Sequence, residues 1–152
     1  MSNVAVKSEQ ERHEGLGLVA EALIARASQT ALDFRSVAEV CVEQDVPEYY
    51  GHWVLAHLPE LRWPSRSNVE FRVCVAECRN VASLELLSRF LEIRSERERE
   101  QKPLFDIVTK ICMDRCLHRP SVISRSLFGN ATHTRMEVEK VRPLIEALCD
   151  ES

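Results

Sequence analysis

The sequence predicts a mainly α-helical protein, an irregular helical bundle of six to seven helices that could include a short two-stranded β element. Apolar residues recur at three- and four-residue steps along most of the chain, which is typical of helices packed around a core. The connections between these segments are short. Length and composition, 152 residues with 45% hydrophobic side chains, predict one helical domain over 15–152 and a flexible N-terminal segment over 1–14.

The first two helices are predicted from their apolar faces and their capping residues. Residues 16–27 place their apolar side chains on one helical face. A second helix is expected to follow the N-cap candidates Asp33 and Ser36, although the three valines of 37–42 leave a strand as the alternative. This helix is expected to bury Phe34, Val37, Ala38 and Cys41.

A third helix is predicted to begin near Pro47 and to end at Pro59, because proline suits a first turn and interrupts a helix interior. A loop is expected over 59–68. Apolar and polar residues then alternate over 69–75, which is typical of a strand. Such a strand needs a partner, which would be 37–42 or a strand of another chain. The start of a helix is the alternative.

The second half is predicted to hold three or four more helices. A broad apolar stripe from Leu84 is expected to run as a helix to Gln101, and the next helix to span 104–117. Residues 121–128 are expected to form a short helix closed by glycine and asparagine. The last helix is expected to follow a capping box, Thr134 and Glu137, and to be kinked by Pro143.

Charge and segment composition set the expected location. The net charge is −4, the N-terminus carries acids and no apolar signal region, and no apolar run reaches the length of a membrane span. We therefore expect a protein of the cytoplasm or nucleus that does not enter a membrane. Its six cysteines are expected to be thiols, since that compartment is reducing.

A basic stretch within this acidic chain predicts an alternative function in nucleic-acid binding. Residues 109–142 carry seven basic and three acidic side chains. Residues 119–142 have the outline of a helix-turn-helix, in which the second helix would enter the major groove. The phosphate contacts of this regulator would come from Arg125, Arg135, Lys140 and Arg142.

Two cysteine pairs predict a second alternative, a zinc-stabilised module. Cys74 and Cys78, and again Cys112 and Cys116, are four residues apart, so each pair could share a helical face and supply two sulfurs to a metal. Two disulfides are another outcome of this pattern. Packing in the core is the favoured interpretation, because free cysteine is a common core residue.

No catalytic motif is present, so the protein is expected not to be an enzyme and to need no cofactor. The chain contains no G-x-S-x-G, no glycine-rich phosphate loop and no H-E-x-x-H. The favoured function is a protein–protein interaction module, an adaptor or a subunit of a larger complex, and self-association is a further option. Its binding residues are expected among the clustered aromatic side chains, which are enriched at interface hot spots: Tyr49, Tyr50, Trp53 and Trp63.

Overall fold

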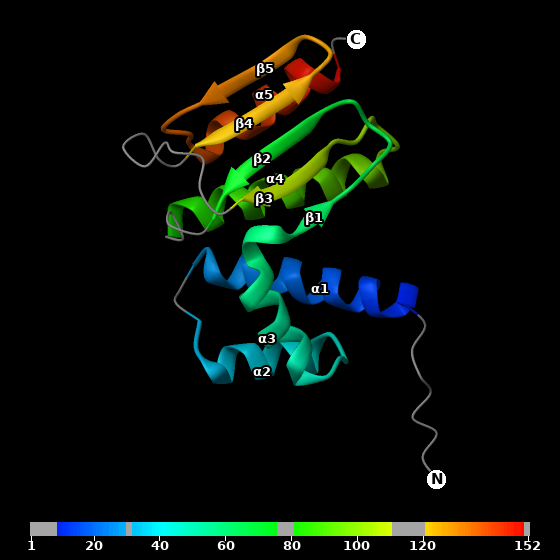
Figure 1. Ribbon diagram of the computed structural model, residues 1–152, viewed down its shortest axis with the longest axis vertical. Helices are drawn as coiled ribbons and strands as arrows, with labels where there is room; N and C mark the ends of the chain where they lie inside the picture. Colours follow the sequence, from blue (N-terminus) through cyan, green and yellow to red (C-terminus); the bar gives the residue numbers. More distant parts are fainter. Residues whose placement is uncertain (1–8, 30–31, 76–80, 111–120, 151–152) are drawn as a thin grey trace.

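The computed structural model describes residues 9–29, 32–75, 81–110 and 121–150. These ranges contain five α-helices, one 3-10 turn and five strands (Figure 1). The helices are α1 (Glu9–Ala27), α2 (Phe34–Glu43), α3 (Glu48–His57), α4 (Val81–Arg99) and α5 (Val138–Cys149), with the turn η1 at Leu58–Glu60. The strands are β1 (Arg62–Trp63), β2 (Glu70–Cys74), β3 (Asp106–Lys110), β4 (Val122–Ser126) and β5 (Gly129–His133).

Helices α1, α2 and α3 pack together at one end of the elongated molecule (Figure 1), and their prediction is confirmed. Residues 37–42 are helical, as preferred over a strand, and Asp33 caps this helix, α2. Its carboxylate accepts hydrogen bonds from the backbone N–H of Ser36 at 2.7 Å and from its hydroxyl at 2.9 Å. Gly51 lets α2 and α3 approach closely, since a Cβ there would lie 2.5 Å from the Val37 side chain.

The strands form one mixed sheet in the order β1-β3-β2-β4-β5. β2 and β3 are parallel neighbours, joined through α4, and the other three pairings are antiparallel. The strand predicted over 69–75 is therefore confirmed. Its neighbours are β3 and β4, and the segment 37–42 that was considered as its partner lies in α2.

The predicted helical bundle is wrong, and the error lies in the second half of the chain. Residues expected within the helix 104–117 include β3, and the expected helix 121–128 contains the whole of β4. The inner strand β3 has three consecutive buried residues instead of strict alternation, and the run through Ile107 and Val108 therefore resembled a helical stripe. Residues 111–117 of that expected helix lie outside the described residues.

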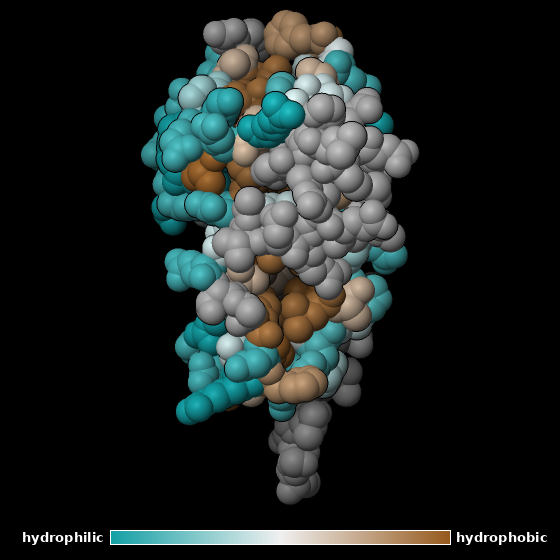
Figure 2. Space-filling model, turned by 90° about the vertical axis from the view of Figure 1, so that its left-hand side faces the viewer, coloured by the Kyte–Doolittle hydropathy of each residue, from teal (hydrophilic) through white to brown (hydrophobic). Residues whose placement is uncertain are grey.

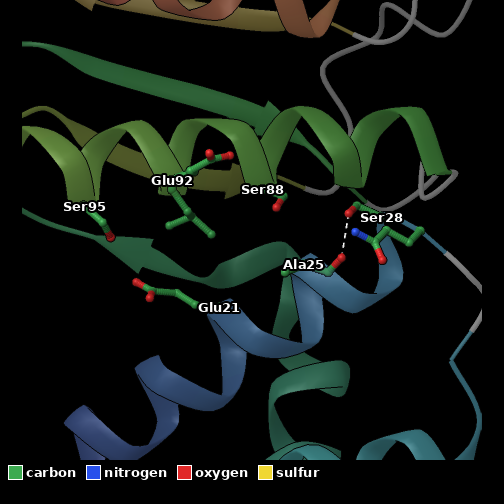
Figure 3. Close-up of a pocket in the computed structure, with 8 residues that line it drawn as sticks. Glu21, Ala25, Ser28, Ser88, Glu92 and Ser95 are labelled. Carbon is green, nitrogen blue, oxygen red and sulfur yellow. Dashed lines mark hydrogen bonds between the residues drawn. The ribbon is translucent and has the colours of Figure 1, made fainter.

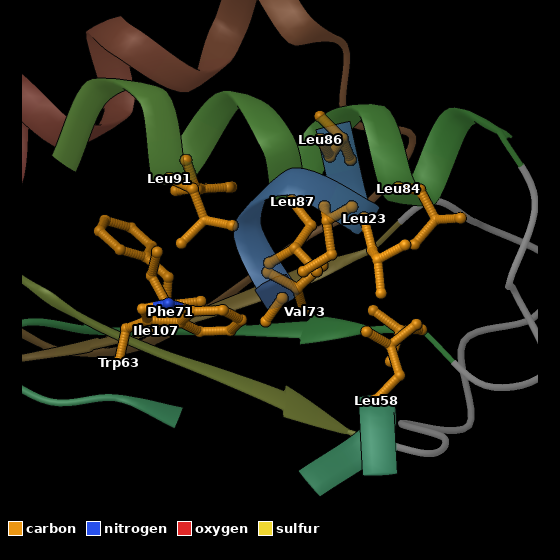
Figure 4. Packing of buried hydrophobic residues seen from close by; sticks show 14 of the residues in the cluster. Leu23, Leu58, Trp63, Phe71, Val73, Leu84, Leu86, Leu87, Leu91 and Ile107 are labelled. Atoms are coloured by element: carbon orange, nitrogen blue, oxygen red, sulfur yellow. The ribbon is translucent and has the colours of Figure 1, made fainter. Parts of the chain in front are cut away.

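The core fills the layer between α4 and one face of the sheet. Phe71 and Ile107 stand opposite each other in β2 and β3 and point toward α4, and Leu87 of α4 points back toward the sheet (Figure 4). Phe90 of α4 lies 4.9 Å from the Phe71 ring, measured between ring centroids. α5 packs beside α4 in the same layer, behind the sheet as drawn in Figure 1.

A buried ion pair joins the two helices of this layer. The guanidinium of Arg97 in α4 contacts both carboxylate oxygens of Asp150, at 2.6 and 3.2 Å, immediately after the end of α5. Its Nε also donates to the carbonyl of Pro103 at 2.8 Å. Because each of the three guanidinium nitrogens donates a hydrogen bond, Arg97 fixes the end of α5 to the start of the segment that leads into β3.

Candidate functional site

The four aromatic side chains predicted to bind a partner fall into two groups. Tyr49 and Trp53 are 64% and 43% exposed, whereas Tyr50 and Trp63 are 3% and 8% exposed. Tyr49 and Trp53 are one helical turn apart and share the outer face of α3. Only these two are accessible to a partner. Tyr50 packs into the core of the helical end, and Trp63 packs beneath α4.

Two further exposed apolar residues, which the sequence did not single out, lie on the neighbouring helix. Phe34 and Val42 of α2 are each 79% exposed, although Phe34 had been expected on the buried face. Residues 34 and 42 are two turns apart and fall on the same side of α2. The ring of Phe34 also lies 5.8 Å from that of His52 in α3, which brings this side of α2 next to the outer face of α3.

We call the set formed by Phe34, Val42, Tyr49 and Trp53 the α2–α3 surface. A groove of about 340 Å³ opens beside Phe34, and its walls include Leu32, Val37 and Leu55. On the face shown in Figure 2, hydrophobic side chains gather in a hollow at the level of these helices. Exposed rings beside an apolar groove are the arrangement that receives an apolar anchor of a partner.

The rim of the α2–α3 surface is acidic. Residues 32–58 contain one arginine, Arg35, and two histidines. The same range contains five carboxylates: Asp33, Glu39, Glu43, Asp45 and Glu48. Arg35 is itself paired with Glu39 at 3.4 Å. Arg26 of α1 takes up part of the charge through Glu39 at 3.1 Å and Glu43 at 3.4 Å. The remaining negative charge favours a partner segment with basic side chains around its apolar anchor.

A second depression, of about 380 Å³, lies between α1 and α4 and differs in chemistry (Figure 3). It is lined mainly by hydroxyls and carboxylates, with Glu21 on one helix and Glu92 and Ser95 on the other. Burial raises the pKa of Glu21, while the positive charge of Arg94 and a hydrogen bond with Trp63 oppose that effect. Among the described residues, no group of three or more histidine, cysteine or acidic side chains is arranged to hold a metal ion.

The helix-turn-helix expected over 119–142 is replaced by a β-hairpin and a helix. Strands β4 and β5 pair from Val122 and His133 to Ser126 and Gly129, and residues 119–120 lie outside the described residues. β-branched residues and Gly129, at φ +108°, favour the hairpin. The apolar spacing of this segment is compatible with a strand as well as with the helix that was predicted. Within residues 121–142, the first of the two helices that a helix-turn-helix requires is therefore replaced by strands.

The four predicted phosphate contacts do not form one cluster. Arg125 lies on β4, and its Nε is 3.9 Å from a carboxylate oxygen of Glu70. Lys140 and Arg142 lie on α5, where Arg142 is paired with Glu96 at 2.8 Å. Arg135 lies in the connection between β5 and α5, at φ +50°. The basic stretch therefore divides between the sheet and the helix layer.

Of the predicted zinc ligands, only Cys74 belongs to the described residues. It is the last residue of β2, it is buried, and its Cα pairs with that of Lys110 at the end of β3. Cys78, Cys112 and Cys116 lie outside the described residues. Cys41, Cys74 and Cys149 are buried thiols that form no disulfide, and burial raises the pKa of Cys149.

A serine–histidine pair lies on the helix side of the hairpin. The hydroxyl of Ser124 is 2.9 Å from Nε2 of His133, and burial lowers the pKa of this histidine, which favours the neutral ring. Ser124 is nevertheless only 2% exposed, so a substrate cannot reach its oxygen. The pair joins β4 to β5 beneath the helix layer.

The sequence matches no protein-family model and no curated protein. Among the described helices, none is both long enough and apolar enough to cross a bilayer.

Proposed function

We propose that this protein is a non-enzymatic docking module, an adaptor or complex subunit that binds another protein through the α2–α3 surface. The observation that carries the proposal is the set of four exposed apolar side chains on two adjoining helices, one of which, Phe34, lines an apolar groove. A group of exposed apolar side chains marks an interaction site more strongly than isolated ones do. The three buried thiols fit residence in a reducing compartment, the cytoplasm or nucleus.

The chemistry of the surface defines the partner. An aromatic or aliphatic anchor would enter the groove between Phe34 and Leu55, and Tyr49 and Trp53 would cover its flank. Basic side chains beside the anchor would meet the acidic rim. A short amphipathic helix with an apolar stripe and flanking lysines or arginines satisfies both requirements.

The experiment is affinity capture from the native source, comparing the full chain with Phe34→Ser and Trp53→Ala and identifying bound proteins by mass spectrometry. Leu127→Ser is the matched control, because Leu127 is 82% exposed on the β4–β5 turn, outside the α2–α3 surface. A partner lost from both α2–α3 variants and retained by the control supports the proposal. A partner retained by all three variants, or lost equally from all three, contradicts it.

Self-association through the same surface is tested separately by sedimentation of the purified protein over a range of concentrations. Dimers that dissociate in Trp53→Ala would make a second copy the occupant of the groove. Such a result would contradict the proposal of a different protein as the partner.

A further inference from the structure

We call the sheet face that no described helix covers the open face, and several cations lie on it. Because side chains alternate along a strand, Phe71, Ile107 and Trp63 point to the helix layer, whereas the adjoining row points to the opposite side. That row contains Arg62, Val108 and Arg72, which stand opposite one another in β1, β3 and β2. Both described helices that reach the sheet, α4 and α5, cover the other face (Figure 1).

Four cations from four strands share this open face. Arg62 and Arg72 lie in one row, Arg125 lies in the row of Glu70, and Lys110 stands opposite Cys74. The arginines of β1 and β2 are two strand spacings apart, about 10 Å. Two carboxylates, Glu70 and Asp106, lie on the same face, so its formal charge is +2 on a chain whose net charge is −4.

Both carboxylates already have partners. Oδ1 of Asp106 accepts hydrogen bonds from the N–H and the hydroxyl of Ser65, at 2.7 and 2.6 Å. Glu70 lies between Arg72 at 2.9 Å and Arg125 at 3.9 Å. Among the described residues, the side chains of Arg62 and Lys110 have no ion pair, so their charge is available to an anionic ligand.

An exposed aromatic side chain lies at the end of the same hairpin. Leu127 and Phe128 form the turn between β4 and β5, directly after Arg125 and Ser126, and both are exposed. The turn is held by the hydroxyl of Ser126, which accepts from the N–H of Phe128 at 3.1 Å. An exposed ring three residues after Arg125 offers a stacking surface for an unpaired base.

We propose that the open face of the sheet binds single-stranded nucleic acid, with Arg62, Arg72, Lys110 and Arg125 contacting phosphates and Phe128 stacking on a base. Cations spread over four strands match an extended phosphodiester chain, which carries a charge at every nucleotide. A single strand is favoured over a duplex because an unpaired base exposes the π-face that Phe128 can contact. This surface is separate from the α2–α3 surface and adds a second ligand to a docking module.

The test is fluorescence anisotropy of a labelled oligouridylate of about 12 nucleotides, titrated with the full chain between low and moderate salt. For a single strand, the logarithm of the binding constant should fall with the logarithm of the salt concentration, with a slope of about −0.7 for each phosphate contact. Arg62→Gln and Arg125→Gln should each make the slope less steep by about 0.7. Phe128→Ser should weaken binding by about fivefold or more.

Two further variants make the test specific to this face. Glu70→Gln removes a negative charge that lies between two arginines. We expect this variant to bind the oligonucleotide about fivefold more tightly at low salt, because two unit charges about 4 Å apart in water interact by about 1 kcal/mol. Arg35→Gln on α2 is the matched control, because its side chain is 88% exposed at the other end of the molecule. It should leave both affinity and slope unchanged.

Each other result would overturn the proposal. Absence of binding at low salt excludes a nucleic-acid ligand, and equal weakening by Arg35→Gln shows that the sheet face is not the site. Binding to vesicles with anionic phospholipid but not to the oligonucleotide would assign the face to a membrane. Self-association that Arg62→Gln abolishes, without oligonucleotide binding, would assign the face to a second copy of the chain.

Discussion

Replacing Trp63 by alanine should unfold a large fraction of the molecule, whereas replacing Trp53 should not. Trp63 is 8% exposed beneath α4, and its side chain also makes a hydrogen bond with Glu21. Truncating a buried tryptophan costs about 3–5 kcal/mol, and a lost hydrogen bond adds about 1 kcal/mol. We therefore expect Trp63→Ala to lower the free energy of unfolding by about 4–6 kcal/mol, a large share of the total for a domain of this size.

Trp53 provides the internal comparison. It is 43% exposed, and its main contact is a stack on His57 at 4.1 Å between ring centroids. Loss of such a contact from a surface position should cost about 1 kcal/mol or less. The difference of about 3–5 kcal/mol between the two variants follows from the burial of Trp63 and its hydrogen bond with Glu21.

The assay is urea unfolding followed by far-UV circular dichroism, with tryptophan fluorescence as a second probe. The chain has two tryptophans, so Trp53→Phe leaves the buried indole as the only emitter and Trp63→Phe leaves the exposed one. Emission should be blue-shifted in Trp53→Phe and red-shifted in Trp63→Phe. Equal loss of stability in the two alanine variants, or the opposite order of emission, would refute the assignment of one tryptophan to the core and the other to the surface.

Three more predictions concern packing and charge. Gly51→Ala places a Cβ 2.5 Å from the Val37 side chain, so it should lower the melting temperature through a cost of about 1–3 kcal/mol, despite the better helix propensity of alanine. Arg97 lowers the pKa of Asp150, so their pair stabilises the fold at neutral pH and the stabilisation is lost as acid titrates the carboxylate, from about pH 5 downward. Asp150→Asn should cost roughly 1–3 kcal/mol at pH 7, less than a fully buried pair because Asp150 is partly exposed, and should flatten the pH dependence of urea unfolding in this range. Because burial raises the pKa of Glu21, its charged form opposes folding, and Glu21→Gln should stabilise the protein at pH 7 but not in acid; destabilisation at pH 7 would contradict this.

The helical end was predictable because local signals agree there with the tertiary structure. The cap at Asp33 and the spacing of the apolar residues 16–27 specify α1 and α2 without help from the rest of the chain. The sheet was not predictable in the same way. β3 and β4 depend on pairing with β2, which is more than 30 residues away from either strand, and such pairing leaves no local signal.

The accessible aromatic residues were only half predictable. The apolar spacing of α3 already places Tyr50 with Val54 on one side, so Tyr49 and Trp53 fall on the other. No local pattern could separate Trp63 from them, because its burial depends on α4 lying over β1 and β3. The exposure of Phe34 was missed for a related reason, since the buried side of α2 is set by its contact with α3.

The two proposed surfaces are opposite in charge and lie on different elements, and this determines how they can work together. An acidic rim on α2 and α3 and a net positive charge on the sheet face mean that a basic protein segment and a nucleic acid would not compete for one site. The same complementarity also attracts one copy of the chain to another, and salt weakens that attraction. Oligonucleotide binding that persists at a protein concentration where sedimentation shows a single species is therefore the result that separates a true ligand from contact between copies.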